Sequence, residues 1–242
     1  MRNDGDTLRP RLDDVRGRIA AAAARSGRPA GAVTLVGVTK TVPAVIVQEA
    51  VAAGLVDLGE NRVQEAQAKI PIVGRANVRW HFIGHLQRNK AGRAVELFDR
   101  VHSVDDAELA EALSRHAVAA GRTLPVLVEV NVSGEASKFG VAPEALGALL
   151  ERMAALPGLV LDGLMTVGPL LESAAAVRPC FVRLRELRDE AERRLGRRLP
   201  ELSMGMSGDF EVAVEEGSTL VRVGGAIFGP RPAPGGTGSG VA

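Results

Sequence analysis

The sequence has no tyrosine, one cysteine among its 242 residues, and aromatic side chains at only 3% of positions. The absence of tyrosine removes the phenol group from the possible catalytic acids and bases. Cys180 cannot form an internal disulfide, so we expect a protein of a reducing compartment. Lysine is also scarce, since it occurs only at positions 40, 69, 90 and 138. Nearly all positive charge is therefore arginine.

The chain also lacks an excess of charge and a long apolar run. Lys and Arg total 30 against 29 Asp and Glu, and no basic block stands apart from acidic neighbours. This balance argues against a nucleic-acid partner. No apolar run approaches membrane-spanning length, and the charged first residues are unlike a signal peptide. We expect a cytoplasmic protein without nucleic-acid or membrane partners, either a monomer or a weak dimer.

Short β-branched runs alternate with helical patterns, which indicates parallel βαβ units. The predicted strands are 33–38, 55–59, 78–84, 100–104, 125–132, 158–167, 201–205 and 219–225. Helical patterns cover 8–26, 43–53, 62–70, 89–97, 105–120, 143–156, 174–195 and 208–216. Eight such units predict an α/β fold, a single (β/α)₈ TIM barrel over residues 1–231 with an N-terminal helix. A doubly wound open sheet is the alternative. The Pro/Gly-rich residues 232–242 are predicted to be disordered.

Lys40 ends the first predicted strand with the same parity as Val36 and Val38. A strand buried on both faces seldom ends in lysine without a reason. In one interpretation its stem is buried and its ammonium group reaches solvent at the barrel mouth. In the other, partial burial and a nearby cation make the amine ready to form an imine with an aldehyde.

The other three lysines differ in their predicted positions. Lys69 falls late in a helix and Lys90 near a helix start, so both are interpreted as solvated charges. Lys138 follows the fifth strand in the loop SGEASKFG. It should face the carboxyl ends of the strands, where barrels of this class place their working residues.

The loops after the last two strands predict a phosphate site. Ser207, in SMGMSGD, is interpreted as the N-cap of the following helix, whose free N–H groups and dipole favour an anion. Gly224 and Gly225 would let backbone amides approach a ligand closely. A plain helix cap and a tight turn are the ordinary alternatives. Asp209 should lie in the first helical turn and point away from the anion.

Three further polar residues fall on predicted strands or at their ends. Arg222 shares strand parity with Leu220, so it should enter the barrel, where it needs an acceptor. A salt bridge and a cofactor ring nitrogen are the two alternatives. Asn61 could bond a ring hydroxyl. His81 is a further cofactor-binding candidate, although a strand histidine is more often a satisfied polar group, and we predict no metal site.

Seven segments of the sequence resemble segments of a known family: GVTKT, GENRVQEA, WHFIGHLQRNK, VNVSGEASKFG, LMTVGP, SMGMSGDFEVAV and GSTLVRVGGAIFG. They run in order from about residue 35 to 231, and together they resemble the YggS/PROSC family, the pyridoxal phosphate homeostasis proteins. Arg88 is a mild departure from the family pattern, in which many relatives have a small residue at this position.

This resemblance implies a barrel related to the N-terminal domain of alanine racemase and a role in binding and distributing pyridoxal 5'-phosphate (PLP). It implies a Schiff base at Lys40 and a ring nitrogen that meets Arg222. It further implies a phosphate held by Ser207, Gly224 and Gly225, with Asn61 beside the ring. Lys138 resembles a family loop lysine with a second role outside the imine.

The same residues bear on whether the protein is an enzyme. Related racemases use a lysine and a tyrosine from a second domain as opposed bases, whereas this chain has no tyrosine and no segment for that domain. An arginine only donates, so a ring nitrogen facing Arg222 would be unprotonated and a weaker electron sink. We therefore expect a carrier that delivers PLP to apo-enzymes. A PLP-dependent racemase or lyase with a histidine base, and a cofactor-free enzyme of phosphorylated substrates, are the alternatives.

Overall fold

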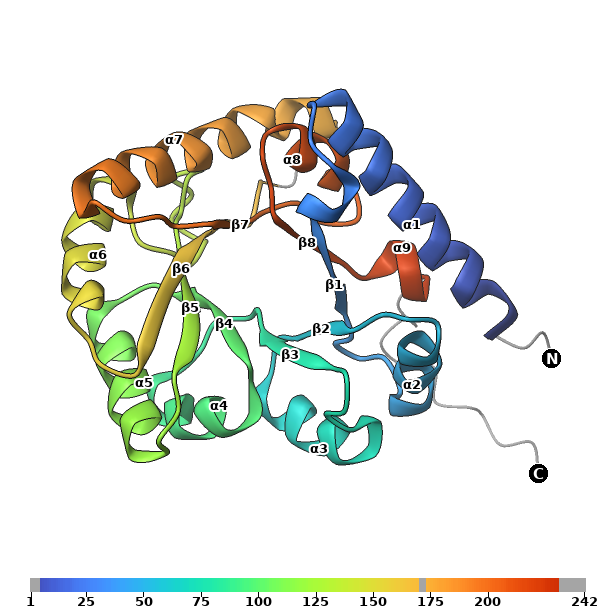
Figure 1. The fold of residues 1–242 in the computed structure, drawn as a ribbon, viewed down its shortest axis with the longest axis horizontal. Coiled ribbons are helices and arrows are strands. Elements are labelled where there is room, and N and C mark those ends of the chain that lie inside the picture. The colour runs from blue at the N-terminus through green and yellow to red at the C-terminus, as the bar shows by residue number, and fades with distance from the viewer. Residues whose placement is uncertain (1–4, 170–172, 231–242) are drawn as a thin grey trace.

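Eight parallel strands close into one barrel in chain order, as the computed structural model shows for residues 5–169 and 173–230 (Figure 1). The strands are β1 (Thr34–Val38), β2 (Asp57–Glu60), β3 (Arg79–Phe82), β4 (Arg100–Val104), β5 (Leu124–Glu129), β6 (Leu159–Met165), β7 (Glu201–Ser203) and β8 (Leu220–Val223). The predicted (β/α)₈ barrel is confirmed. The open-sheet alternative is wrong, because β8 pairs with β1.

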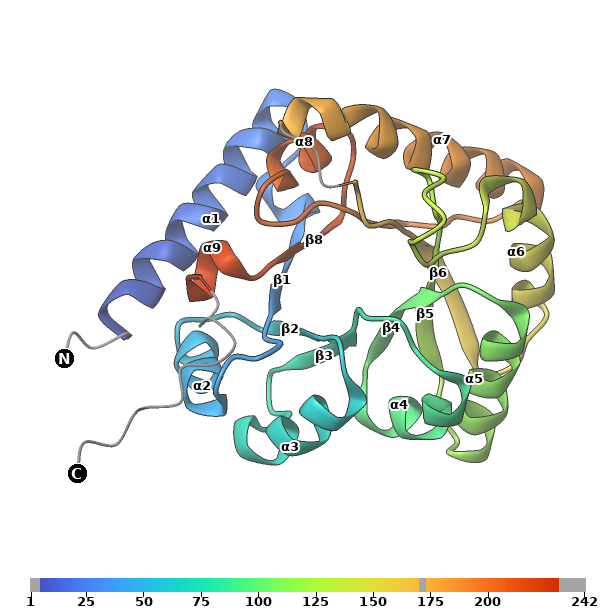
Figure 2. The same ribbon diagram turned by 180° about the vertical axis from the view of Figure 1, so that it is seen from behind.

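Helices surround the barrel on its outside, as the two opposite views show (Figures 1 and 2). The α-helices are α1 (Gly5–Arg25), α2 (Ala44–Ala52), α3 (Val63–Val73), α4 (Ala91–Leu97), α5 (Ala107–Ala119), α6 (Leu146–Ala154), α7 (Arg178–Leu195), α8 (Phe210–Glu215) and α9 (Gly225–Phe228). Short 3₁₀ turns are η1 (Ala30–Ala32), η2 (Arg88–Lys90), η3 (Pro143–Ala145) and η4 (Ala174–Val177). Helix α1 packs against α8, α9 and α2.

Local chemistry explains where several elements begin and end. Asp106 caps α5, because its carboxylate accepts a hydrogen bond from the Leu109 N–H at 2.6 Å. Gly196 ends α7 with a left-handed φ of 63°, which glycine adopts without steric cost. Strands β3, β5, β6, β7 and β8 stop two or three residues earlier than predicted. The residues gained by the loops include Gly224 and Gly225 of the candidate site. The predicted disordered tail, 232–242, lies outside the described residues.

Two apolar layers stabilise the barrel. The larger one fills the space between the sheet and the helices and includes Trp80, Phe98 and Phe181, each fully buried. The smaller one lies inside the barrel, where Val36, Leu127, Met165 and Leu220 form a separate buried cluster. This cluster fixes which strand positions face inward, because side chains alternate along a strand.

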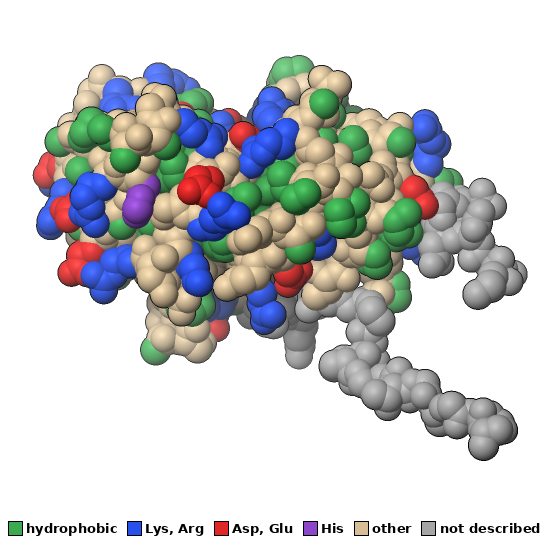
Figure 3. All heavy atoms as spheres, turned by 90° about the horizontal axis from the view of Figure 1, so that it is seen from below, with side chains coloured by type: hydrophobic (Ala, Val, Ile, Leu, Met, Phe, Trp, Pro, Cys, Tyr) green, Lys and Arg blue, Asp and Glu red, His purple; other side chains and the backbone are tan. Residues whose placement is uncertain are grey.

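The surface carries charge of both signs. Lys and Arg side chains are interspersed with Asp and Glu on the face drawn in Figure 3, without a block of one sign. No helix in the described part of the chain is both long and apolar enough to cross a membrane.

Candidate functional site

The candidate site lies at the carboxyl ends of neighbouring strands. Lys40 follows β1 by two residues and continues the inward parity of Val36, which belongs to the inner apolar cluster. Strand β1 pairs with β8, with Val36 opposite Arg222. The loop after β8 therefore begins beside the segment that ends in Lys40. The structure thus brings together the ends of β8 and β1, as closure of the barrel requires.

The peptide around Lys40 is held by a buried polar contact on one side and an exposed one on the other. Thr39 donates its hydroxyl hydrogen to Glu60 Oε1 at 2.7 Å. Thr41 has a left-handed φ of 64°, uncommon for a residue with a side chain, and its N–H donates to Glu65 Oε2 at 2.9 Å. These contacts fix the direction in which Lys40 leaves the strand.

The interpretation of Lys69 as a solvated charge is wrong. Its side chain is only 11% exposed, and its Nζ lies 2.7 Å from Glu60 Oε1 and 2.5 Å from the carbonyl oxygen of Thr39. Burial raises the pKa of Glu60, and the hydrogen bonds from Lys69 and Thr39 oppose that shift. Lys69 is therefore a buried support of the Lys40 segment.

Ser207, Gly224 and Ala226 form a small cradle of polar groups. The N–H groups of Gly224 and Ala226 donate to Ser207 Oγ at 3.2 and 3.3 Å. A Cβ at Gly224 would lie 3.3 Å from Val38, so a larger residue would crowd the end of β1. A Cβ at Gly225 would meet only Ser207 Oγ, at 4.0 Å, so the space in front of Gly225 is open. The hydroxyl and the amides of this loop suit an anion.

The predicted capping role of Ser207 is wrong. The N-cap of α8 is Asp209, whose Oδ1 accepts a hydrogen bond from the Met206 N–H at 2.6 Å. Helix α8 is six residues long, and Ser207 bonds to the β8–α9 loop instead. An anion at this loop would therefore meet the loop amides and the Ser207 hydroxyl, and not the dipole of α8.

Arg222 lies inside the barrel, 4% exposed, as its parity predicted. Its Nη1 donates to Ser203 Oγ at 2.6 Å and its Nη2 to the carbonyl oxygen of Thr166 at 2.8 Å. Neither acceptor is a carboxylate, and the two bonds use two of the five guanidinium N–H donors. Burial lowers the pKa of Arg222 to about 10, against the opposing charges of Glu129 and Asp209, so it is a cation at neutral pH.

Asn61 follows β2 directly and packs against the loop after β3. A Cβ at Gly84 would lie 2.4 Å from the carbonyl oxygen of Asn61, so only glycine permits this close approach. The half-buried Asn61 thus stays at the same end of the barrel as Lys40.

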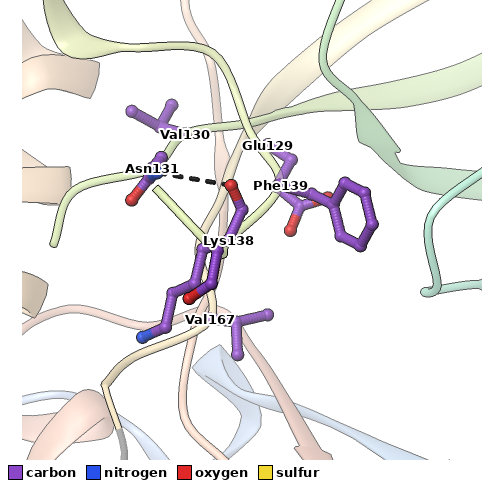
Figure 4. Close-up of a pocket in the computed structure, with 7 residues that line it drawn as sticks. Glu129, Val130, Asn131, Lys138, Phe139 and Val167 are labelled. Atoms are coloured by element: carbon purple, nitrogen blue, oxygen red, sulfur yellow. Dashed lines mark hydrogen bonds between the residues drawn. The ribbon is translucent and has the colours of Figure 1, made fainter. Parts of the chain in front are cut away.

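Lys138 lines a pocket of about 170 Å³ together with Glu129, Asn131, Phe139 and Val167 (Figure 4). Its Nζ lies 3.0 Å from Glu135 Oε1, and its carbonyl oxygen accepts from Asn131 Nδ2 at 3.4 Å. The pocket follows the carboxyl end of β5, as predicted for this loop.

Glu129 is the strongly perturbed acid of this pocket. Burial and the charge of Asp105 raise its pKa to about 7, while the charge of Arg222 opposes the shift. The sequence interpretation missed it, because a glutamate at the end of an apolar strand has no motif around it. The available signal was the strand parity of Glu129, which matches that of the inward-facing Leu127.

His81 is not brought together with the Ser207 loop. Its Nε2 lies 2.9 Å from Asp57 Oδ1 and its Nδ1 lies 2.9 Å from His102 Nε2, so both ring nitrogens are engaged within the protein. It lines a cavity of about 210 Å³ with Thr34, Asp57, Arg79, Asp99, Arg100, Pro125, Glu201 and Leu220. Most of these residues begin their strands, so this cavity lies at the amino end of the barrel.

Comparison with known proteins defines the class first. The family model of the alanine racemase N-terminal domain matches residues 11–232. The chain is 46% identical over 221 residues to a pyridoxal phosphate homeostasis protein of Aquifex aeolicus, covering 91% of this chain and 97% of the relative. It is 47% identical over 225 residues to the protein of that name from Pseudomonas aeruginosa, covering 93% and 96%.

A solved structure agrees with these relatives. PipY of Synechococcus elongatus with PLP bound is 41% identical, with a TM-score of 0.77 over 87% of this chain and all of that one. The protein therefore belongs to the pyridoxal phosphate homeostasis protein family, within the alanine racemase N-terminal fold.

Proposed function

We propose that this protein binds PLP and serves in its intracellular homeostasis, as a carrier and not as an enzyme. The observation that carries the proposal is the cradle of Ser207, Gly224 and Ala226, which opens beside the strand end that leads to Lys40. The names of the relatives and the PLP bound to PipY support the same conclusion.

Each candidate residue has a distinct role in this proposal. Bound PLP supplies a phosphate, an aromatic ring and an electrophilic aldehyde. The Lys40 amine condenses with that aldehyde to a Schiff base, with release of one water molecule. Ser207, Gly224 and Gly225 hold the phosphate through hydroxyl and amide groups. Asn61 lies by the ring.

Arg222 supports a carrier role through its donors. A guanidinium has no acceptor atom, and at a pKa of about 10 it keeps its proton at neutral pH. We infer that it donates to the pyridine nitrogen, which then stays unprotonated. An unprotonated ring withdraws electrons weakly and disfavours the carbanion chemistry of most PLP enzymes.

The alternative is a PLP-dependent racemase or lyase, and one observation favours it. His85 follows β3 at the carboxyl end of the barrel, and its Nδ1 lies 3.5 Å from Asp105 Oδ2. Its ring stacks on Phe139 at 3.9 Å between centroids. A histidine paired with a carboxylate at the mouth could act as a second base in place of the missing tyrosine.

Transfer and turnover experiments separate the two functions. PLP-loaded protein mixed with an apo PLP enzyme should activate that enzyme faster than free PLP at the same concentration of unbound cofactor. The same protein should show no racemisation or decarboxylation of common amino acids. Turnover of one of these amino acids, abolished by Lys40→Ala and reduced by His85→Asn, would show that the protein is an enzyme and contradict the carrier function.

A further inference from the structure

Five buried side chains form one hydrogen-bonded line through the barrel interior. Asp57 Oδ1 lies 2.9 Å from His81 Nε2, and His81 Nδ1 lies 2.9 Å from His102 Nε2. His102 Nδ1 lies 2.9 Å from Ser203 Oγ, which accepts from Arg222 Nη1 at 2.6 Å. The residues come from β2, β3, β4, β7 and β8, and none is more than 4% exposed. The line joins the amino-end cavity to Arg222.

The two ends of the line fix the direction of its hydrogens. Burial raises the pKa of Asp57, but hydrogen bonds from His81 and Arg79 outweigh it and lower the value to about 2. Asp57 is therefore a carboxylate that only accepts, so His81 Nε2 must carry a hydrogen. At the other end Arg222 only donates, so Ser203 Oγ must accept.

His102 completes the assignment. Burial, together with the charges of Arg222 and Arg100, lowers the pKa of His102 well below the usual value, so His102 is neutral and carries one hydrogen. With that hydrogen on Nε2, His102 donates to His81 and accepts the Ser203 hydroxyl hydrogen, and every hydrogen of the line has an acceptor. With the hydrogen on Nδ1, His81 must be a cation and the Ser203 hydroxyl loses His102 as its acceptor. The first arrangement is therefore the more stable one.

We propose that Asp57, His81, His102 and Ser203 form a positioning relay that orients the guanidinium of Arg222 toward the cofactor ring. The ring contact rests on the function proposed above, whereas the order of hydrogens is a property of the protein alone. Since Asp57 and His81 line the amino-end cavity, a change at that end of the barrel alters the environment of the ring at the other. In this proposal His81 acts on the cofactor indirectly, through His102, Ser203 and Arg222. It does not contact the cofactor directly, contrary to the sequence prediction.

Nitrogen-15 NMR of histidine-labelled, cofactor-free protein tests the relay without PLP. At neutral pH, His81 and His102 should both be neutral with the hydrogen on Nε2. Assignment follows from the single variants of the four histidines. A His102 hydrogen on Nδ1, or a charged His81, would overturn the relay.

Two variants with matched controls test its effect on the ring. Asp57→Leu removes the acceptor that holds the His81 hydrogen on Nε2, so the Nδ1–H form of His102 should become populated and the absorption maximum of bound PLP should shift. Arg79→Gln removes the other partner of Asp57 but leaves the line intact, so it should change neither. If Asp57→Leu does not fold, Ser203→Ala should shift the maximum, while Ser218→Ala, a buried serine outside the line, should not.

The outcomes separate this inference from the proposed function. If the tautomers are as expected and both relay variants leave the spectrum unchanged while Arg222→Leu shifts it, the ring contact stands and the relay does not position Arg222. If Arg222→Leu also leaves the spectrum unchanged, the proposed ring contact itself is wrong.

Discussion

Lys69 and Glu60 form a buried ion pair directly beneath the segment that carries Lys40. Lys69 Nζ lies 2.7 Å from Glu60 Oε1, the Glu60 side chain is fully buried, and the same ammonium group bonds the carbonyl oxygen of Thr39. The pair therefore links α3 and β2 to the end of β1. It makes the position of Lys40 depend on two residues that do not belong to the proposed cofactor contacts.

Lys69→Met should destabilise the protein, because it leaves the Glu60 carboxylate buried without its cation. Removal of one partner of a buried pair costs about 3 kcal/mol, and the loss should be smaller in Lys69→Met with Glu60→Gln. The loss should also shrink as the pH falls, because protonation of Glu60 removes the buried charge. Urea unfolding measures the effect, with Arg183→Met as the control in a half-exposed pair. Equal losses in the two single variants would show that the Lys69 pair is not specially stabilising.

Glu129 should make the stability of the cofactor-free protein depend on pH near neutrality. Its folded-state pKa of about 7 exceeds the ordinary value of 4.5, so the folded state holds the proton more tightly than the unfolded chain. The resulting stabilisation is complete below the ordinary pKa and is lost as the pH rises through about 7. The difference corresponds to about 3 kcal/mol. Urea unfolding across this range should show the slope in the wild type and in Glu144→Gln, and a flatter profile in Glu129→Gln.

Ser207→Ala should weaken PLP binding, because it removes one hydrogen bond to a charged phosphate and one support of the β8–α9 loop. A bond of this kind contributes about 1.5–3 kcal/mol, which is roughly a ten- to hundredfold increase in Kd. Equilibrium dialysis measures the change, and Ser26→Ala, at the end of α1, is the control. An unchanged Kd would remove Ser207 from the phosphate site.

Lys138→Ala should change the rate at which PLP passes to an apo-enzyme, while the attachment at Lys40 stays largely intact. Its loop follows β5 at the carboxyl end of the barrel, and its Nζ is buried 3.0 Å from Glu135 Oε1, so we expect a movement of this loop to bring the amine to the cofactor on entry or exit. Stopped-flow activation of the acceptor enzyme measures the rate, with Lys90→Ala as the matched control. Identical rates in the wild type and Lys138→Ala would leave Lys138 as a partner of Glu135 only.

The fold and the loops of the site could be predicted because strand periodicity and loop composition are local signals. The alternation of apolar runs predicted eight strands, and parity predicted that Arg222 enters the barrel. Periodicity does not say which polar residues of a helix face the sheet. Lys69 was therefore misplaced, since its partner Glu60 lies on β2.

Long-range hydrogen bonds account for the other differences. Ser207 occupies a position typical of an N-cap, but its hydroxyl bonds to the loop after β8, and Asp209 stands at the N-cap position of the helix. His102 and Ser203 are separated by 101 residues, and only closure of the barrel brings them together. No local pattern around either residue predicts that contact.

The attachment of PLP at Lys40 is the central claim, and borohydride reduction followed by peptide mass mapping tests it most directly. Reduction of the PLP-loaded protein should fix the mass of the cofactor on the single peptide that contains Lys40, and Lys40→Ala should carry no label there. Label on Lys69, Lys90 or Lys138 in the wild-type protein, with Lys40 unmodified, would contradict the account.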